Sequence, residues 1–289
     1  MAVYKGLSAE ALEAEYNLIA RRGPDFSQVV DRWLARSEAH RIASGARADL
    51  AYGDGDREKL DLFFSGDANG PLLVYIHGGY WQRGDKGMYS FVTEAFIKHG
   101  VSVAVINYNL TPSVRMGAIP PQIRKAIAWC WHNADELQFN PDKLFVMGHS
   151  AGGHLTAMMM ATDWPAIDPE LPVDLVKAGI PISGLFELEP LIHTSINEGP
   201  RMDVAEARMQ SPCFIPPHTN APQLVVVGGE ESQEFLRQSD DYVAQYASAS
   251  RKMERYDVPS ADHFDELDRL AEDDSPFFQK SLALIQSNS

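Results

Sequence analysis

The chain has 289 residues, which is enough for one large α/β domain or for two smaller ones. Hydrophobic residues make up 45% of the sequence, so a sizeable core is expected and a largely disordered chain is excluded. The 40 acidic and 25 basic residues give a formal net charge of −15 at pH 7, and so acidic a surface disfavours nucleic acid and anionic membranes as partners.

The sequence also bears on location. Its first 16 residues, MAVYKGLSAEALEAEY, lack the apolar core of a secretory signal, and no apolar run approaches the ~18 residues that span a bilayer. The two cysteines, Cys130 and Cys213, lack the spacing of a metal site and are expected to be free thiols. These features predict a cytoplasmic protein without a membrane partner.

The N-terminal segment is predicted to be helical. Apolar residues recur at helical spacing over residues 12–19 and again over residues 30–34, with a break at residues 23–24, a Gly-Pro pair. We therefore expect residues 1–55 to form a helical arm that packs on a main domain of residues 56–289.

Strands and helices alternate through the main domain. After a briefly alternating segment at 59–64, short continuous apolar runs predict strands buried on both faces at residues 72–76, 101–106, 144–147, 178–182 and 224–227. Helical patterns separate them at residues 89–99, 122–133, 154–161 and 234–247. This order predicts an α/β fold with a mostly parallel central sheet and helices on both faces. The irregular stretch 190–222 is either a lid or cap over a site or a long connection.

The sequence Gly148-His149-Ser150-Ala151-Gly152 lies between a predicted strand and a predicted helix. A serine in a G-x-S-x-G turn of this kind sits at a strained backbone position with its hydroxyl exposed, and the glycines remove Cβ atoms that would clash. Ser150 is therefore the candidate nucleophile.

A second motif, His77-Gly78-Gly79-Tyr80-Trp81, directly follows the strand predicted at 72–76. It resembles the HGG-type loop of esterases, whose amides hold an oxyanion together with the amide after the nucleophile. The candidate donors are the N–H groups of Gly79, Tyr80 and Ala151. His77 is expected to brace the loop, and Tyr80 and Trp81 either wall a substrate pocket or belong to the core.

A nucleophilic serine needs a general base. In α/β-hydrolases the chain order is serine, acid and then histidine, each on a loop after a strand. His263 fits this order because it follows the strand predicted at 253–258, on a loop that we expect to be exposed.

The acid that orients the histidine should follow the strand at 224–227. Glu230 and Glu231 are adjacent there, and only one of them can point inward. Asp257 and Asp262 are rivals, although most carboxylates in so acidic a chain are expected at the surface. No zinc-binding HExxH motif, GxGxxG fingerprint or P-loop occurs, so no metal, nucleotide or other cofactor is expected.

These motifs together resemble the α/β-hydrolase superfamily and, more narrowly, the kynurenine formamidase (arylformamidase) family. The likeness covers most of residues 5–285 and rests on HGGYW at 77–81, GHSAGG at 148–153, the segment 181–197, Glu231-Ser232-Gln233-Glu234-Phe235 and Asp262-His263-Phe264. The family has an aspartate at the place of Glu231. The resemblance therefore assigns the orienting carboxylate to Glu231 rather than to Glu230.

The resemblance implies an α/β-hydrolase catalytic domain at 56–289. The implied reaction is hydrolysis of an aryl formamide such as N-formyl-L-kynurenine, through a triad of Ser150, His263 and Glu231 and a formyl-enzyme. The implied substrate pocket contains Tyr80, Trp81, His149 and Phe186, with the aryl ring against Trp81 or Phe186. Two alternatives stay open: a carboxylesterase that acts on small acyl esters with the same triad, and an inactive hydrolase fold that serves as a binding protein. A homodimer is also left open.

Overall fold

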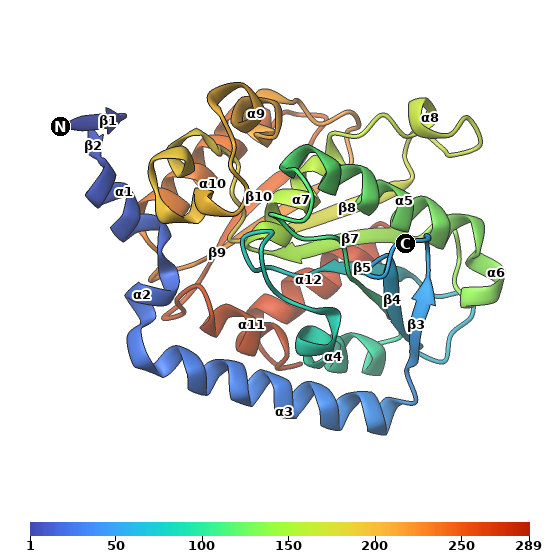
Figure 1. Cartoon of the computed structure of the whole chain (residues 1–289). Helices are drawn as coiled ribbons and strands as arrows, with labels where there is room; N and C mark the ends of the chain where they lie inside the picture. The colour runs from blue at the N-terminus through green and yellow to red at the C-terminus, as the bar shows by residue number, and fades with distance from the viewer.

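The centre of the molecule is an eight-stranded sheet (Figure 1). The structure is a computed structural model that describes residues 1–289. The strands of the sheet are β3 (Arg47–Ala51), β4 (Lys59–Phe63), β5 (Leu72–Ile76), β6 (Ser102–Ile106), β7 (Leu144–His149), β8 (Val176–Ile182), β9 (Gln223–Gly228) and β10 (Met253–Val258). Their order is β10-β9-β8-β7-β5-β6-β4-β3; the pairs from β10 to β6 are parallel, whereas β3 and β4 are antiparallel. The predicted mostly parallel sheet is confirmed.

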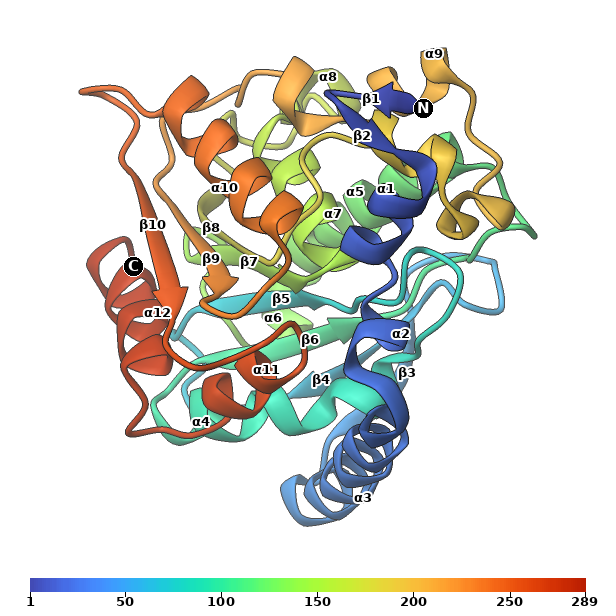
Figure 2. The same ribbon diagram turned by 90° about the vertical axis from the view of Figure 1, so that its left-hand side faces the viewer.

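The central strands are buried on both faces. Every residue of β5, β6, β7 and β9 is buried, as expected for continuous apolar runs between two helical layers. The helices are α1 (Ala9–Tyr16), α2 (Leu18–Arg22), α3 (Phe26–Ser44), α4 (Thr93–Lys98), α5 (Ile119–His132), α6 (Ala134–Leu137), α7 (Ala151–Met160), α8 (Trp164–Ile167), α9 (Val204–Met209), α10 (Gln233–Tyr246), α11 (Asp265–Leu270) and α12 (Pro276–Ser287). Figures 1 and 2 show α5, α7 and α10 on one face of the sheet and α4, α11 and α12 on the other.

Short 3₁₀ helices connect these elements. They span Gly23–Asp25, Lys86–Val92, Met116–Ala118, Glu189–His193, Ser195–Glu198 and Pro212–Phe214. The α-helix predicted over 89–99 is therefore shorter, because its first part is the 3₁₀ segment Lys86–Val92 and only α4 is α-helical.

The N-terminal segment runs along one side of the body (Figure 2). It begins with a two-stranded hairpin, β1 (Ala2–Tyr4) and β2 (Leu7–Ser8), and continues through α1, α2 and α3. Trp33 of α3 packs on Phe91 with ring centroids 5.5 Å apart, and Arg36 binds both carboxylate oxygens of Glu94 at 2.9–3.0 Å. Residues 47–51 of the predicted arm form β3, the edge strand of the main sheet.

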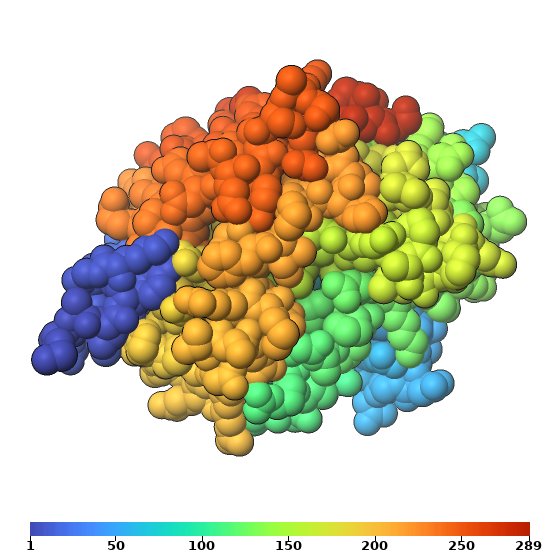
Figure 3. All heavy atoms as spheres, turned by 90° about the horizontal axis from the view of Figure 1, so that it is seen from above, coloured from blue at the N-terminus to red at the C-terminus, as the bar shows by residue number.

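The irregular segment 190–222 lies beside the N-terminal residues (Figure 3). Ser195 donates hydrogen bonds from its amide, at 2.8 Å, and from its hydroxyl, at 2.6 Å, to the carboxylate of Glu13 in α1. The 3₁₀ segments and α9 give it local structure. This segment is therefore structured and contacts the arm.

The strand order determines where a site can form. β5 lies between β6 and β7, so the chain changes direction across the sheet at β5. Loops after β5 and β7 therefore meet at one edge, and such switch points are the usual ligand crevices of open α/β sheets. No helix of the structure combines the length and the apolar character needed to cross a bilayer.

Candidate active site

Ser150 lies at the turn between β7 and α7. Its backbone has φ 59°, in the left-handed region that is rare for residues other than glycine, and its amide donates to the carbonyl of Ile182 at 2.8 Å. Gly152 leaves room for the turn, because a Cβ atom there would lie 1.9 Å from the carbonyl oxygen of Ile76. The local geometry is that of a serine held outward at the head of a helix.

The loop after β5 packs against this turn. A Cβ atom on Gly78 would lie 3.1 Å from the Cβ atom of Ser150, so the two loops touch. Gly79, Tyr80 and Trp81 all have positive φ angles, of 113°, 50° and 57°. The amides of Gly79, Tyr80 and Ala151 donate to no acceptor within the protein. These three N–H groups are the expected oxyanion donors.

His77 braces the loop from below. Its Nδ1–H donates to the carbonyl of Gly78 at 2.7 Å, and its ring stacks between Tyr89 and Tyr108 at centroid distances of 5.7 and 4.5 Å. Burial lowers the pKa of His77 to about 4, so the imidazole is neutral at pH 7. The side chain therefore holds the loop and does not reach the cavity described below.

His263 and Glu231 form a buried pair. The imidazole Nδ1 is hydrogen-bonded to the Glu231 carboxylate, and the two residues are 4% and 3% exposed. Glu230 points to solvent, so the structure brings Glu231 and not its neighbour to the histidine. The expectation that His263 lies on an exposed loop is wrong, because Phe235 and Phe264 pack edge-on against its ring.

The two rival carboxylates are engaged elsewhere. Asp257 pairs with Arg255 at 2.9 Å. Asp262 pairs with Arg22 of α2 at 2.5 Å and accepts from the amide of Phe264 at 2.9 Å. Asp262 thus fixes the loop that carries His263 without orienting its imidazole.

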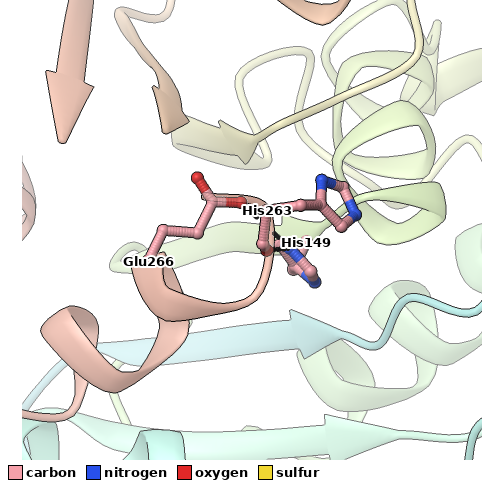
Figure 4. Close-up of side chains that lie close together, drawn as sticks. All are labelled: His149, His263 and Glu266. Carbon is pink, nitrogen blue, oxygen red and sulfur yellow. Dashed lines mark hydrogen bonds and ion pairs between the residues drawn. The ribbon is translucent and has the colours of Figure 1, made fainter. Parts of the chain in front are cut away.

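A second buried carboxyl, Glu266, lies behind the site (Figure 4). The Nε2–H of His149 donates to the backbone carbonyl of His263 at 2.8 Å and also lies 3.0 Å from Oε1 of Glu266. The hydroxyl of Ser183 donates to the other carboxyl oxygen, Oε2, at 3.0 Å. Burial, reinforced by the negative charge of Glu231, raises the pKa of Glu266 well above its usual range. Burial lowers the pKa of His149 well below its usual range, so His149 is neutral and serves to tie the His263 loop to the serine turn.

Ser150 and His263 line the same cavity, whose volume is about 270 Å³. Its wall is mostly apolar and aromatic, with contributions from the N-terminal arm: the lining residues are Leu18, Ile19, Phe26, Val30, Trp33, Gly79, Tyr80, Arg83, Gly84, Met88, Tyr89, His149, Ser150, His263 and Phe264. Of the four residues predicted for the pocket, Tyr80 and His149 line this cavity. The arm lines this cavity, whereas the stretch 190–222 does not.

Two predicted pocket residues lie elsewhere. Trp81 is fully buried beneath the loop, where its indole N–H donates to His154 at 3.2 Å. Phe186 stacks on Tyr242 with ring centroids 4.2 Å apart, in a separate small cluster. Both aromatics therefore stabilise the body. The sequence analysis did not predict the arm residues, because apolar periodicity does not show which surface a helix covers. It did not predict Arg83 or Glu266 either, because an isolated charged residue forms no recognisable motif.

Comparisons with known proteins place this geometry in a family. The family model BD-FAE matches residues 60–172. Kynurenine formamidase of Salmo salar is 30% identical over 247 residues, which cover 82% of this chain and 81% of the relative. The chain belongs to the kynurenine formamidase family.

Further similarities extend over nearly the whole chain. Kynurenine formamidase of Danio rerio is 28% identical over 286 residues, covering 94% of this chain and 95% of the relative. A crystal structure from Silicibacter, provisionally assigned as a thioesterase, superposes with a TM-score of 0.79 at 33% identity and covers 96% of this chain and 97% of that one. This member of the kynurenine formamidase family is thus a hydrolase with the α/β-hydrolase fold.

Proposed function

We propose that this hydrolase cleaves aryl formamides such as N-formyl-L-kynurenine through Ser150, His263 and Glu231. The observation that carries the proposal is that Ser150 and the imidazole of the buried His263–Glu231 pair line one aromatic cavity, beside three unpaired amides. A nucleophile, a base with an orienting carboxylate and oxyanion donors are the parts that acyl transfer needs.

In the proposed reaction, Ser150 Oγ attacks the formyl carbon while His263 takes the hydroxyl proton. The carbonyl oxygen becomes an oxyanion held by the N–H groups of Gly79, Tyr80 and Ala151, each of which is worth roughly 3 kcal/mol. His263 then gives its proton to the aniline nitrogen, and the C–N bond breaks. Water, deprotonated by His263, attacks the formyl ester. The ester C–O bond breaks, His263 returns the proton to Ser150 Oγ, and the product leaves as formic acid, which ionises to formate.

The cavity wall supports an aryl substrate. Five aromatic side chains line it: Phe26, Trp33, Tyr80, Tyr89 and Phe264. Aromatic rings bind one another through large apolar contact areas and offset or edge-on geometry. An apolar cavity with few polar groups near the nucleophile is therefore better suited to a formanilide than to a small polar amide.

The test is turnover of N-formyl-L-kynurenine, followed by the absorbance of the aniline product. Ser150→Ala should lose activity by about 10³-fold or more. Ser239→Ala is the matched control, because Ser239 is also fully buried but its hydroxyl lies on α10 and has no hydrogen-bond partner. Equal activity of wild type and Ser150→Ala would contradict the proposal.

An ester or thioester substrate is the second candidate. It is favoured by the thioesterase assignment of the similar Silicibacter structure, and the proposed triad would act on either acyl group. Rates on N-formyl-L-kynurenine and on short-chain 4-nitrophenyl esters and thioesters separate the two. Turnover of the esters without turnover of the formamide would assign the protein to this second class.

A further inference from the structure

One positively charged side chain lies in the wall of the catalytic cavity. Among its 15 lining residues, Arg83 is the only lysine, arginine, aspartate or glutamate. The side chain follows the HGG loop directly, and its amide donates to the carbonyl of Gly79 at 3.1 Å. The position of Arg83 is thus tied to the same turn that presents the expected oxyanion donors.

The guanidinium of Arg83 has no partner within the protein. Only Arg21 and Arg83 among the arginines have neither an ion pair nor a side-chain hydrogen bond. The chain carries 15 more acidic than basic residues, so an arginine without a carboxylate is unusual here. Both residues are exposed, but Arg83 lines the catalytic cavity and Arg21 does not.

Arg83 also lines a second hollow that adjoins the first. The two share Leu18, Ile19, Tyr80 and Arg83, and the second hollow has a volume of about 270 Å³. Its remaining lining residues are mostly polar: Asn17, Gln82, Ser195, Ile196 and Glu198. The carboxylate of Glu198 likewise has no ion pair, because Arg201 binds only the backbone carbonyl of that residue. An apolar cavity that contains the nucleophile therefore lies beside a polar hollow that offers one charge of each sign.

The cavity is apolar and the adjoining hollow is polar and charged. Together they suit a substrate that has an aromatic end and a charged end. The aromatic lining suits an aryl formamide, and a zwitterionic α-amino carboxylate would match the unpaired charges of the adjoining hollow. A guanidinium binds a carboxylate with two parallel hydrogen bonds, which gives direction as well as charge. Glu198 can accept from the ammonium group.

We propose that Arg83 is the specificity-determining residue that binds the carboxylate of an amino-acid side arm on the aryl substrate, with Glu198 facing the ammonium group. This inference rests on the proposed function and names the substrate class of the same site. It predicts that the enzyme prefers a formanilide with an amino-acid arm to the same formanilide without one.

The experiment compares N-formyl-L-kynurenine with 2-formamidoacetophenone, which keeps the formanilide and the ketone but lacks the amino-acid arm. Wild type should show the higher kcat/KM on N-formyl-L-kynurenine. In Arg83→Gln this ratio should fall by about 10- to 100-fold, mainly through KM, because a hydrogen-bonded ion contact to the substrate is lost. Arg83→Lys should restore part of the ratio, and Arg21→Gln, which removes the same charge from an exposed site, should leave it at the wild-type value.

Two results would overturn the inference. One is an unchanged ratio in Arg83→Gln, and the other is an equal loss on both substrates, which would make Arg83 a structural residue of the loop. If wild type turns over neither formamide, the proposed function fails instead. The inference is then decided by calorimetric binding of L-kynurenine and 2-aminoacetophenone: a preference for L-kynurenine that disappears in Arg83→Gln supports it, and equal affinities in wild type contradict it.

Discussion

Glu230 and Glu231 are adjacent in sequence and have opposite environments. Glu230 is exposed, whereas Glu231 is buried against the imidazole of His263. A carboxylate that accepts from Nδ1–H fixes the tautomer of the histidine and stabilises the imidazolium that forms during acyl transfer. Only the inward-facing residue can have this role.

The two glutamates therefore offer a direct comparison. Glu231→Gln should lower kcat by about 10³- to 10⁴-fold, because a neutral amide stabilises neither the tautomer nor the charge. Glu230→Gln should keep kcat within about twofold of wild type. Steady-state kinetics at pH 7.5 on the best substrate measure both, and a larger loss in Glu230→Gln would show that the acid is assigned to the wrong residue.

Glu266 predicts a pH dependence of stability. Its pKa is raised in the folded protein, chiefly by burial, so the folded state keeps a proton that the unfolded chain releases above the ordinary glutamate pKa. Wild type should therefore lose stability as pH rises from that ordinary value toward the raised one. The loss would be about 1.4 kcal/mol for each unit by which the pKa is raised.

Glu266→Gln removes this proton while keeping the shape of the side chain. Its free energy of unfolding should decline less than that of wild type between pH 5 and pH 8. Urea unfolding at several pH values measures the difference. Glu38→Gln is the control, because Glu38 is exposed on α3 and forms no ion pair, and parallel curves for wild type and Glu266→Gln would refute a raised pKa.

At the scale of elements, the serine turn depends on the close approach of two strands and a helix. The head of α7 passes the ends of β5 and β7 so closely that glycines are required at Gly148 and Gly152. A Cβ atom on Gly148 would lie 2.3 Å from the carbonyl oxygen of Gly152. The same packing that positions Ser150 thus excludes larger residues beside it.

Gly152→Ala should be destabilising by ~3 kcal/mol, because its Cβ atom would overlap the backbone of β5. Gly117→Ala is the matched control, since the nearest atom to its Cβ would be 3.4 Å away on a side chain. Thermal unfolding of both variants measures the effect. Similar unfolding temperatures for Gly152→Ala and wild type would show that the strands can separate at no cost.

At the scale of the whole molecule, the cavity is closed by the opposite end of the chain from His263. Leu18, Ile19, Phe26, Val30 and Trp33 of the arm line the cavity together with His149, Ser150, His263 and Phe264, which lie more than a hundred positions later. Ion pairs of Arg22 with Asp265 at 2.9 Å and of Arg36 with Glu94 at 2.9 Å hold the arm on the body. The arm is therefore a wall of the site.

Cytoplasmic location and a homodimer remain predictions.

Val30→Trp tests this arrangement, because a larger side chain on α3 would fill part of the cavity. We expect KM for an aryl formamide to rise about tenfold, a loss of 1.4 kcal/mol in binding. Leu34→Trp is the control, since Leu34 lies one turn further along α3 and is 44% exposed. An unchanged KM in Val30→Trp, with native unfolding behaviour, would mean that the substrate does not contact the arm.

The sequence alone determined the features that depend on neighbouring residues. Continuous apolar runs predicted the parallel strands, because a strand between two helical layers has no solvent-facing side. Gly148 and Gly152 predicted the serine turn, because only glycine fits so tight a connection. The chain order of Ser150 and His263 placed both at the carboxyl ends of strands.

Tertiary structure decided everything that depends on distant segments meeting. The inward turn of Glu231 depends on the loop after β9 packing beside β10, and the family resemblance rather than any spacing anticipated it. Trp81 and Phe186 look like pocket residues in the sequence but lie in the core, whereas Phe26 and Trp33 of the arm supply part of the aromatic wall. Hydrophobic periodicity shows that a side chain is buried but not which residues it packs against. The cavity could therefore be described only from the tertiary structure, in which the N-terminal arm and the loop of His263 lie side by side.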